Sequence, residues 1–217
     1  MMSLMHLLVL ADSRLPTGGH VHSGGVEEAV TSGLVGDLDT LRAYLRRRVR
    51  THGLVTASVA AAVAGLRLSV VEADRETDAR TPAPAARQAS RTQGRGLVRL
   101  ARRVWPDFHV DGASAWETVG ATPHLAVATG VVGRSAGLNP LQTAESVVYT
   151  TMTGSATAAQ RLLALDPADV AALTFELAPL CAETAAQAQH ELADLSDPLL
   201  DVLAQRHAER DRPLFAS

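Results

Sequence analysis

The chain of 217 residues contains no lysine, and all 20 of its basic residues are arginine. This absence excludes a lysine nucleophile, a Schiff base and a Walker-type phosphate-binding lysine. Cys181 is the single cysteine, so neither an intrachain disulfide nor a zinc cluster of several thiolates can form within one chain. A lone cysteine is typical of a reducing compartment.

Aromatic residues make up only 3% of the chain, although 47% of it is hydrophobic. The core must therefore be built from alanine, leucine and valine, which favours closely packed helices over sheets. The net charge of −3 gives no overall reason to expect nucleic-acid binding. The longest apolar runs, 53–66 and 123–133, are too short to span a bilayer. Residues 1–10 lack the basic start and the cleavage site of a signal peptide, so the expected location is cytoplasmic.

Helix signals recur along the whole chain, and no stretch alternates as a strand would. Capping residues predict helix starts at Ser23, Asp37, Ser69, Thr81, Thr122, Asn139, Asp166 and Asp197. Gly33 and Gly53 predict helix ends, and Pro179 should kink or split the helix predicted over 167–193. The segment 106–113 is expected to be a loop. We therefore predict an all-α fold: one globular domain of about ten helices over residues 1–217.

A glycine-rich loop at residues 12–25 is the most unusual stretch of the sequence. Its special backbone residues are Pro16, Gly18, Gly19, Gly24 and Gly25. Proline fixes its own φ, and glycine opens conformations that other residues avoid, so the loop must follow a defined path. We expect Ser23 to cap a helix beginning near Gly24, with Glu27 and Glu28 in its positive first turn.

His20 and His22, between the two glycine pairs, are the sharpest candidates for metal ligands. In an extended loop their side chains point the same way, which suits two ligands on one metal. Two histidines do not complete a site, and further ligands would have to come from Asp12, Glu27, a second copy or a partner. The alternative is that both are surface residues of the loop. No orienting acid is evident for a Ser23–His22 nucleophile and base, so a catalytic pair is not predicted.

Arginines recur at spacings of three and four along the helix predicted to run toward Trp105: Arg87, Arg91, Arg95, Arg99, Arg102 and Arg103. The spacing predicts one basic face, which leaves open a helical nucleic-acid-binding protein, although net acidity and few aromatics argue against it. An all-α metal-dependent enzyme is the other alternative, and it would need more ligands on facing helices. We expect Glu76 and Asp78 to be exposed acids, and His124 to be a capping or packing residue.

The glycine loop resembles the signature near the start of the urease accessory protein F (UreF) family, roughly Leu-Pro-x-Gly-Gly-Phe-x-Tyr-Ser-x-Gly-Leu-Glu. The matching residues are Leu15, Pro16, Gly18, Gly19, Ser23, Gly25 and Glu27. Here His20 and His22 replace the two aromatic positions of that signature.

Three further patches follow in the order of the family, and they extend the resemblance over nearly the whole chain. Residues 89–97 are similar to Ala-Ser-x-x-x-Gly-Arg-x-Leu, and residues 158–162, after a match at 124–130, to Ala-Ala-x-Arg-Leu. The fourth patch comprises 197–201, 205–207 and the Leu-Phe-x-Ser of the C-terminal tail, 211–217. Pro213 stands where the family often has arginine, and Arg212 is displaced by one position.

The resemblance implies an all-helical, usually dimeric and non-enzymatic protein. It would bridge the D-type (also called H-type) accessory protein on apo-urease and the G-type nickel GTPase, which together insert nickel into urease. No cofactor is expected to be held stably, because nickel is handled by the complex. We expect His20, His22, Arg212 and an exposed Phe215 to contact the partners, since aromatic and arginine side chains suit interfaces. Arg161 is expected in the core or at a dimer seam.

Overall fold

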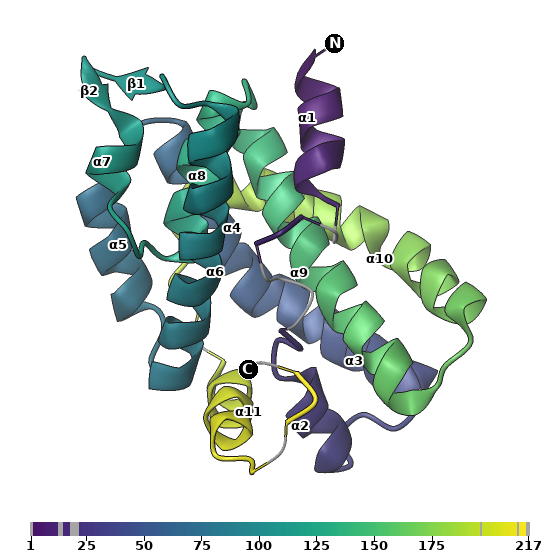
Figure 1. Ribbon diagram of the computed structural model, residues 1–217. Coiled ribbons are helices and arrows are strands. Elements are labelled where there is room, and N and C mark those ends of the chain that lie inside the picture. Colours follow the sequence, from purple (N-terminus) through teal and green to yellow (C-terminus); the bar gives the residue numbers. More distant parts are fainter. Residues whose placement is uncertain (1, 13–14, 18–21, 196, 212, 216–217) are drawn as a thin grey trace.

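The computed structural model describes residues 2–12, 15–17, 22–195, 197–211 and 213–215 (Figure 1). Its helices are α1 (Met2–Leu10), α2 (Val26–Thr31), α3 (Leu38–Arg48), α4 (Leu54–Ala64), α5 (Val70–Ala79), α6 (Pro84–Val104), α7 (Ala115–Val119), α8 (Leu125–Ser135), α9 (Pro140–Leu163), α10 (Pro167–Ala188) and α11 (Pro198–Ala208). The predicted all-α class is confirmed. Among the described helices, none has the length and apolarity needed to cross a membrane.

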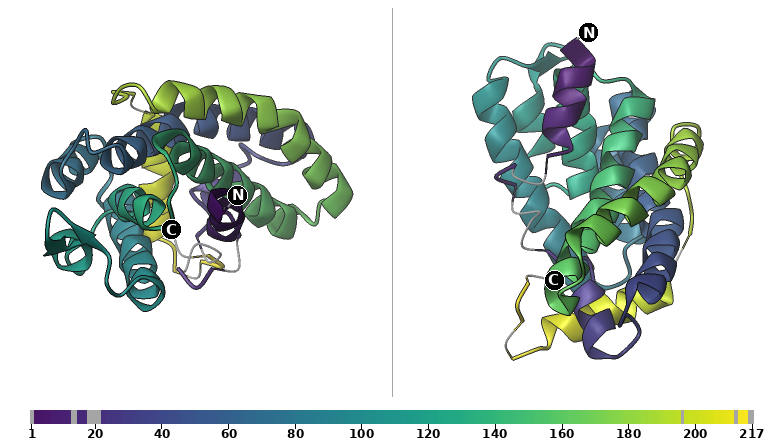
Figure 2. Two further views of the ribbon diagram at one scale, coloured as in Figure 1. Left: turned by 90° about the horizontal axis from the view of Figure 1, so that it is seen from above. Right: turned by 90° about the vertical axis from the view of Figure 1, so that its right-hand side faces the viewer.

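Helix α4 lies at the centre of the molecule and contributes to two hydrophobic clusters. Its Leu54 and Ala61 join a cluster formed mainly by α2, α3, α9, α10 and α11. Its Val59 and Val63 join a second cluster with α5, α6, α7 and α8. Helix α10 packs along α9 on one side of the molecule, and α6 packs against α8 on the other (Figures 1 and 2). The buried α4 therefore holds the two halves together, as its alanine- and valine-rich sequence predicts.

Some of the predicted helix N-caps are present in the structure, and others are not. Asp37, Ser69 and Asn139 each form a capping box with the residue three positions later. The Asp166 and Asp197 side chains also accept hydrogen bonds from the first turns of α10 and α11.

The predictions for Ser23, Thr81 and Thr122 are wrong. Gly24 and Gly25 adopt φ values of 64° and 86°, which delays the start of α2 to Val26 and leaves Gly25 as its N-cap. Helices α6 and α8 begin after Ala83 and His124, because the chain stays extended for two residues longer than predicted in each case. The Thr81 hydroxyl donates instead to the Thr77 carbonyl at the end of α5, at 2.8 Å.

Two predicted helix interruptions are also absent. Gly53 was expected to end a helix, but a π-helical segment, η2 (Val49–Gly53), joins α3 to α4 without a break. Helix α10 continues through Pro179, an exposed residue, so the helix is not split there.

The segment predicted to be a loop forms a small antiparallel hairpin. Strand β1 (His109–Val110) pairs with β2 (Ala113–Ser114). Asp111 and Gly112 make the turn with positive φ values of 52° and 81°, as a two-residue hairpin turn requires.

Candidate functional site

Helix α2, which directly follows the glycine-rich loop, meets the C-terminal tail at one buried carboxylate, that of Glu27. The two left-handed glycines, Gly24 and Gly25, turn the chain into α2, and Glu27 lies in the first turn of that helix. A side chain at Gly25 would approach the Tyr44 hydroxyl, and that hydroxyl already donates to the Gly24 carbonyl at 2.9 Å. The loop therefore enters α2 along one path, which points the Glu27 side chain into the protein.

Three groups from the C-terminal region bind the Glu27 carboxylate. The Nε2 atom of His207, on α11, lies 2.6 Å from Oε2. The backbone N–H groups of Leu214 and Phe215 donate to Oε1 and Oε2 at 2.8 and 3.0 Å. Glu27 is 2% exposed and His207 is 1% exposed, so these contacts are sheltered from water. The tail accordingly lies beside α2 (Figure 1).

The environment keeps the Glu27 carboxylate charged. Burial by itself raises the pKa of a carboxyl group, but the hydrogen bonds from Leu214, His207 and Phe215 outweigh it, and the pKa of Glu27 is lowered. The neighbouring Glu28 carboxylate accepts a hydrogen bond from Arg210 at 3.0 Å. Two successive acids of α2 therefore fasten the end of the chain.

Of the four residues predicted to contact the partners, only His22 and Phe215 lie in the described part of the chain. His20, Arg212, Gly18 and Gly19 lie outside the described residues. Pro16 is exposed, Gly25 and Glu27 are buried, and His22 is half-buried.

The structure differs from the predicted placement of Phe215 and Arg161. Phe215 was expected to be exposed, but it is half-buried and packs against the core cluster, because its backbone N–H is hydrogen-bonded to Glu27. The neighbouring Leu214 projects outward instead and is 80% exposed. Arg161 is exposed at the end of α9, so it does not lie in the core, and its place at a dimer seam stays a prediction.

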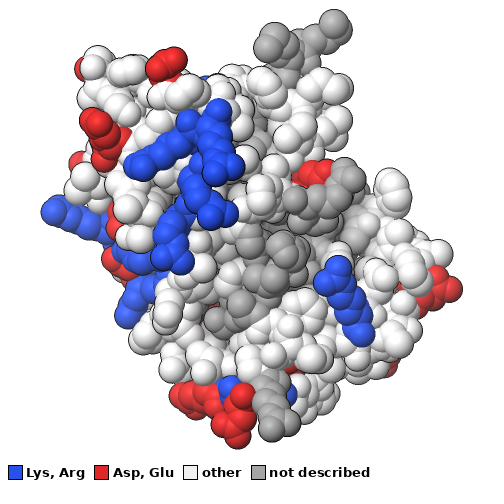
Figure 3. Space-filling view, in the orientation of Figure 1, with Lys and Arg blue, Asp and Glu red and all other residues white. Residues whose placement is uncertain are grey.

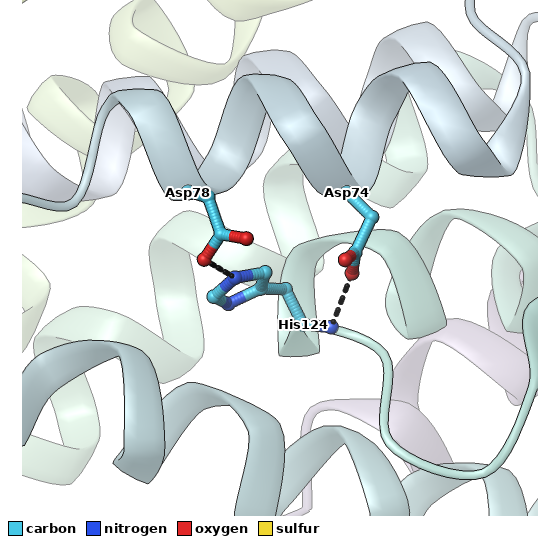
Figure 4. Close-up of side chains that lie close together, drawn as sticks. All are labelled: Asp74, Asp78 and His124. Atoms are coloured by element: carbon cyan, nitrogen blue, oxygen red, sulfur yellow. Dashed lines mark hydrogen bonds and ion pairs between the residues drawn. The ribbon is translucent and has the colours of Figure 1, made fainter. Parts of the chain in front are cut away.

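A second cluster joins α5 to the start of α8 (Figure 4). Asp74 and Asp78 lie one turn apart on α5, and both point toward His124, the buried N-cap residue of α8. The His124 Nε2 atom is 2.8 Å from Oδ1 of Asp78, and its backbone N–H donates to Asp74 at 3.1 Å. Its Nδ1 atom lies 3.0 Å from the hydroxyl of Ser90, on α6.

This cluster has the residue types of a metal site, but it already contains a cation. One ligand atom from each of Asp74, Asp78 and His124 lies within 4.8 Å of the other two. The Arg91 guanidinium donates to Asp74 and Asp78 at 2.9 and 2.8 Å. Burial raises the pKa of Asp78, but His124 and Arg91 outweigh it, and the pKa is lowered. The arrangement is that of a structural joint between three helices, with the arginine in the place of a metal.

Sequence reasoning missed this joint and the partner of Glu27. Asp78 was predicted to be an exposed acid among arginines, whereas it binds His124 and Arg91. The spacing of Asp74 and Asp78, four residues apart on one helix, was the available signal. For His207 no local signal exists, because its partner is 180 positions away in the chain.

The predicted basic face on α6 is present in part (Figure 3). Arg95, Arg99 and Arg103 are exposed, and none of them belongs to an ion pair within the part of the chain that the structure describes. Arg91 faces the acids of α5, so the stripe divides into a structural end and a solvent-facing end.

Comparisons with known proteins agree with the resemblance in the sequence. The UreF family model matches residues 35–178. Along the full length of both chains, the protein is 74% identical to the urease accessory protein UreF of Mycolicibacterium vanbaalenii and 68% identical to that of Mycobacterium marinum. It is 66% identical to the protein of the same name from Mycobacterium tuberculosis, again over the whole of both chains. The full-length matches include the loop and the tail, which lie outside the range of the family model.

Proposed function

The chain belongs to the UreF family of urease accessory proteins, and from this premise we propose that it is an adaptor in urease maturation. As a member of this family it is a non-catalytic accessory protein rather than an enzyme. In the proposed role it bridges the D/H-type accessory protein on apo-urease and the G-type nickel GTPase. Nickel is the cargo of the assembled complex, and this chain holds no cofactor of its own.

The observation that supports an adaptor is the joint at Glu27 between the tail and α2, the helix that directly follows the loop. The two segments lie at opposite ends of the sequence, and both resemble patches of the family. Glu27, on the helix that directly follows the loop, holds the tail through His207 and two backbone N–H groups. The described part of the tail therefore forms part of the surface beside α2. Leu214 projects from this surface and offers an apolar anchor of the kind that interfaces use.

The same proposal includes assembly as a homodimer and action in the cytoplasm. An adaptor with two copies of the recruiting surface can hold two partner molecules at once, which raises the effective concentration of each. Size-exclusion chromatography with light scattering on the purified chain tests the dimer directly. A single species at the mass of one chain at micromolar concentration would contradict it.

A deletion strain tests the process itself. Cells lacking this chain should contain urease that is inactive and poor in nickel, and excess nickel should restore part of the activity. A plasmid carrying the full chain should restore full activity. Normal urease maturation in the deletion strain would refute the proposed function.

Co-purification tests the surface. A chain lacking residues 213–217 should lose the D/H-type protein from a tagged pull-down while its helical circular dichroism is kept. A chain shortened at the N-terminus by Met1 alone serves as the matched control. If the shortened tail still retains the D/H-type protein, the tail is not the contact.

A further inference from the structure

Helix α6 carries positive charge alone, and four of its arginines are exposed. Its 21 residues include six arginines and no aspartate or glutamate. The whole chain has 23 acidic residues and a net charge of −3, so a long surface helix without a single acid departs from its composition. An acid and a base four positions apart stabilise a helix, as Glu76 and Arg80 do at the end of α5. The sequence of α6 forgoes this stabilisation.

Contacts within the protein account for only half of the α6 arginines. Arg87 and Arg91 lie within ion-pair distance of acids on α5, and Arg102 donates to a backbone carbonyl at 2.9 Å. The other three are exposed, and in the described parts of the chain none of them belongs to an ion pair. They form the exposed basic face of α6: Arg95, Arg99 and Arg103.

The exposed basic face is a straight row of like charges. Its members recur every four residues, so they lie along one side of α6 and span about 12 Å. Figure 3 shows basic side chains gathered in a band on this side of the molecule. Like charges four positions apart repel, and the helix dipole offsets this for Arg103 in the last turn but not for Arg95 in the middle of the helix. The missing counter-charge therefore points to another molecule.

The glycine-rich loop borders this face on one side. Gly96 follows Arg95 on α6, and a Cβ atom built on Gly96 would lie 2.6 Å from the Thr17 carbonyl oxygen. The loop therefore packs closely against the α6 backbone beside the arginines. On the other side of the face, Arg91 belongs to the joint with the acids of α5. The exposed basic face is thus a narrow strip with a packed boundary on each side.

We propose that the exposed basic face docks an acidic helical segment of a partner protein, with carboxylates three or four residues apart. The acids of such a segment repeat at the same rise as the arginines of α6, so each guanidinium can meet a carboxylate through two parallel hydrogen bonds. Nucleic acid fits less well, because three arginines neutralise few phosphates and the net charge of the chain is negative. The inference does not depend on the proposed function.

The test is an NMR titration of the ¹⁵N-labelled full chain, because exposed ion pairs are individually weak and NMR detects weak binding. The probe is an alanine-based helical peptide with glutamates at four-residue spacing. A peptide of the same length with glutamine in their place is its control. The amide signal of Gly96 and the side-chain Nε–H signals of Arg95 and Arg99 report on the face. Saturable shifts that weaken as salt is raised are expected with the glutamate peptide, and none with the glutamine peptide.

Charge reversal locates the binding on α6. Arg95→Glu/Arg99→Glu should weaken binding at least about tenfold, because two attractive contacts become repulsive. Arg46→Glu/Arg50→Glu is the matched control, since these arginines are also exposed, are also four positions apart, and change the net charge equally. The control should bind within about twofold of the unaltered chain, because salt screens distant charges.

Arg95→Gln/Arg99→Gln keeps the test decisive if charge reversal disturbs α6, because glutamine is a good helix former. This variant should bind the glutamate peptide several-fold more weakly, and circular dichroism of each variant verifies the fold. The inference is overturned if the glutamate peptide gives no saturable shifts, or if the α6 variants bind it as tightly as the control does. It is equally overturned if a DNA duplex shifts the same signals at a lower concentration than the peptide.

Discussion

The imidazole of His207 and the carboxylate of Glu27 lie 2.6 Å apart, and both side chains are almost completely buried. They are 180 positions apart in the chain, so this pair closes the two ends of the protein on each other. Because the same carboxylate also binds the N–H groups of Leu214 and Phe215, the position of the tail depends on the charge of a single side chain. In the proposed adaptor role, the same carboxylate would link the stability of the fold to partner recognition by the tail.

Glu27→Gln should destabilise the protein by about 1 to 3 kcal/mol, because a neutral amide cannot accept all three hydrogen bonds at full strength in a buried site. Urea unfolding followed by circular dichroism measures the change. Glu117→Gln, at an exposed position on α7, is the control and should change stability by less than about 0.5 kcal/mol. Equal stabilities for the two variants would show that the carboxylate does not hold the tail.

The Glu27 contribution should also depend on pH. The pKa of Glu27 in the folded protein lies below its ordinary value of 4.5, so the ionised carboxylate stabilises the fold fully above pH 4.5. That contribution is lost as the pH falls through the folded pKa. The stability difference between the unaltered chain and Glu27→Gln should therefore be constant near neutral pH and shrink below pH 4.5.

Urea unfolding at a series of pH values from 7 to about 3 tests this dependence. The pKa values of Asp78 and Asp197 are lowered too, by their His124, Arg91 and Arg47 partners acting against burial. Both chains keep these acids, so their loss of stability in acid cancels in the difference. A difference that stays constant down to pH 3 would argue against a lowered pKa of Glu27.

The sequence predicts most of the fold, because helix caps and the alanine-rich core are local properties. Ser69 with Glu72 and Asn139 with Gln142 are capping boxes readable from three-residue spacings. The failures occur where a neighbouring residue overrides the local rule. Ser23 could not cap α2, because the two glycines after it take left-handed conformations. The Asp111-Gly112 dipeptide is a hairpin signal, although the segment 106–113 was expected to be a loop.

The site was predictable only in part. The resemblance to the UreF family singled out Glu27 and the tail separately, but the pairing of Glu27 with His207 arises from tertiary packing and leaves no local pattern. Phe215 was expected to project outward, yet the hydrogen bond from its N–H to Glu27 turns it toward the core. Long-range pairs of this kind depend on how α2 and α11 pack, and a single sequence does not encode that in any short spacing.

Two glycines in long helices should respond in opposite ways to substitution by alanine. A Cβ atom on Gly94 would lie 2.1 Å from the Pro123 carbonyl oxygen, so Gly94→Ala should force α6 and α8 apart and cost about 1 to 3 kcal/mol. Gly154, inside α9, has nothing within 4 Å of the same position. Gly154→Ala should therefore stabilise the protein by about 0.5 to 1 kcal/mol. Thermal unfolding of both variants gives the two signs, and a loss of stability in Gly154→Ala would contradict the account.

Arg91→Gln should weaken the joint between α5, α6 and α8. It removes the guanidinium shared by Asp74 and Asp78 and leaves only Arg87, 4.0 Å from Asp78, so the expected cost is about 1 to 2 kcal/mol because the cluster is partly open to solvent. Arg95→Gln, one turn later and exposed, should have almost no effect on stability.

Removing the Arg91 guanidinium also frees three ligand atoms, so zinc should raise the melting temperature of Arg91→Gln and leave that of the unaltered chain unchanged. Zinc stabilisation of both proteins alike would show that Arg91 does not occupy the place of a metal.

Substitutions at Leu214 and Phe215 should separate effects on partner binding from effects on stability. Leu214 is 80% exposed, so Leu214→Ala should leave the free energy of unfolding within about 0.5 kcal/mol of the original value. Phe215 packs against the core, so Phe215→Ala should lower the free energy of unfolding by more than about 0.5 kcal/mol, because buried apolar area is lost. If the surface formed by the loop and the tail recruits the D/H-type protein, Leu214→Ala should reduce co-purification from a tagged pull-down even though the chain remains fully folded. Retention of the partner by Leu214→Ala at the original level would mean that the exposed leucine is not an anchor, and the recruiting surface would then have to be sought away from the tail.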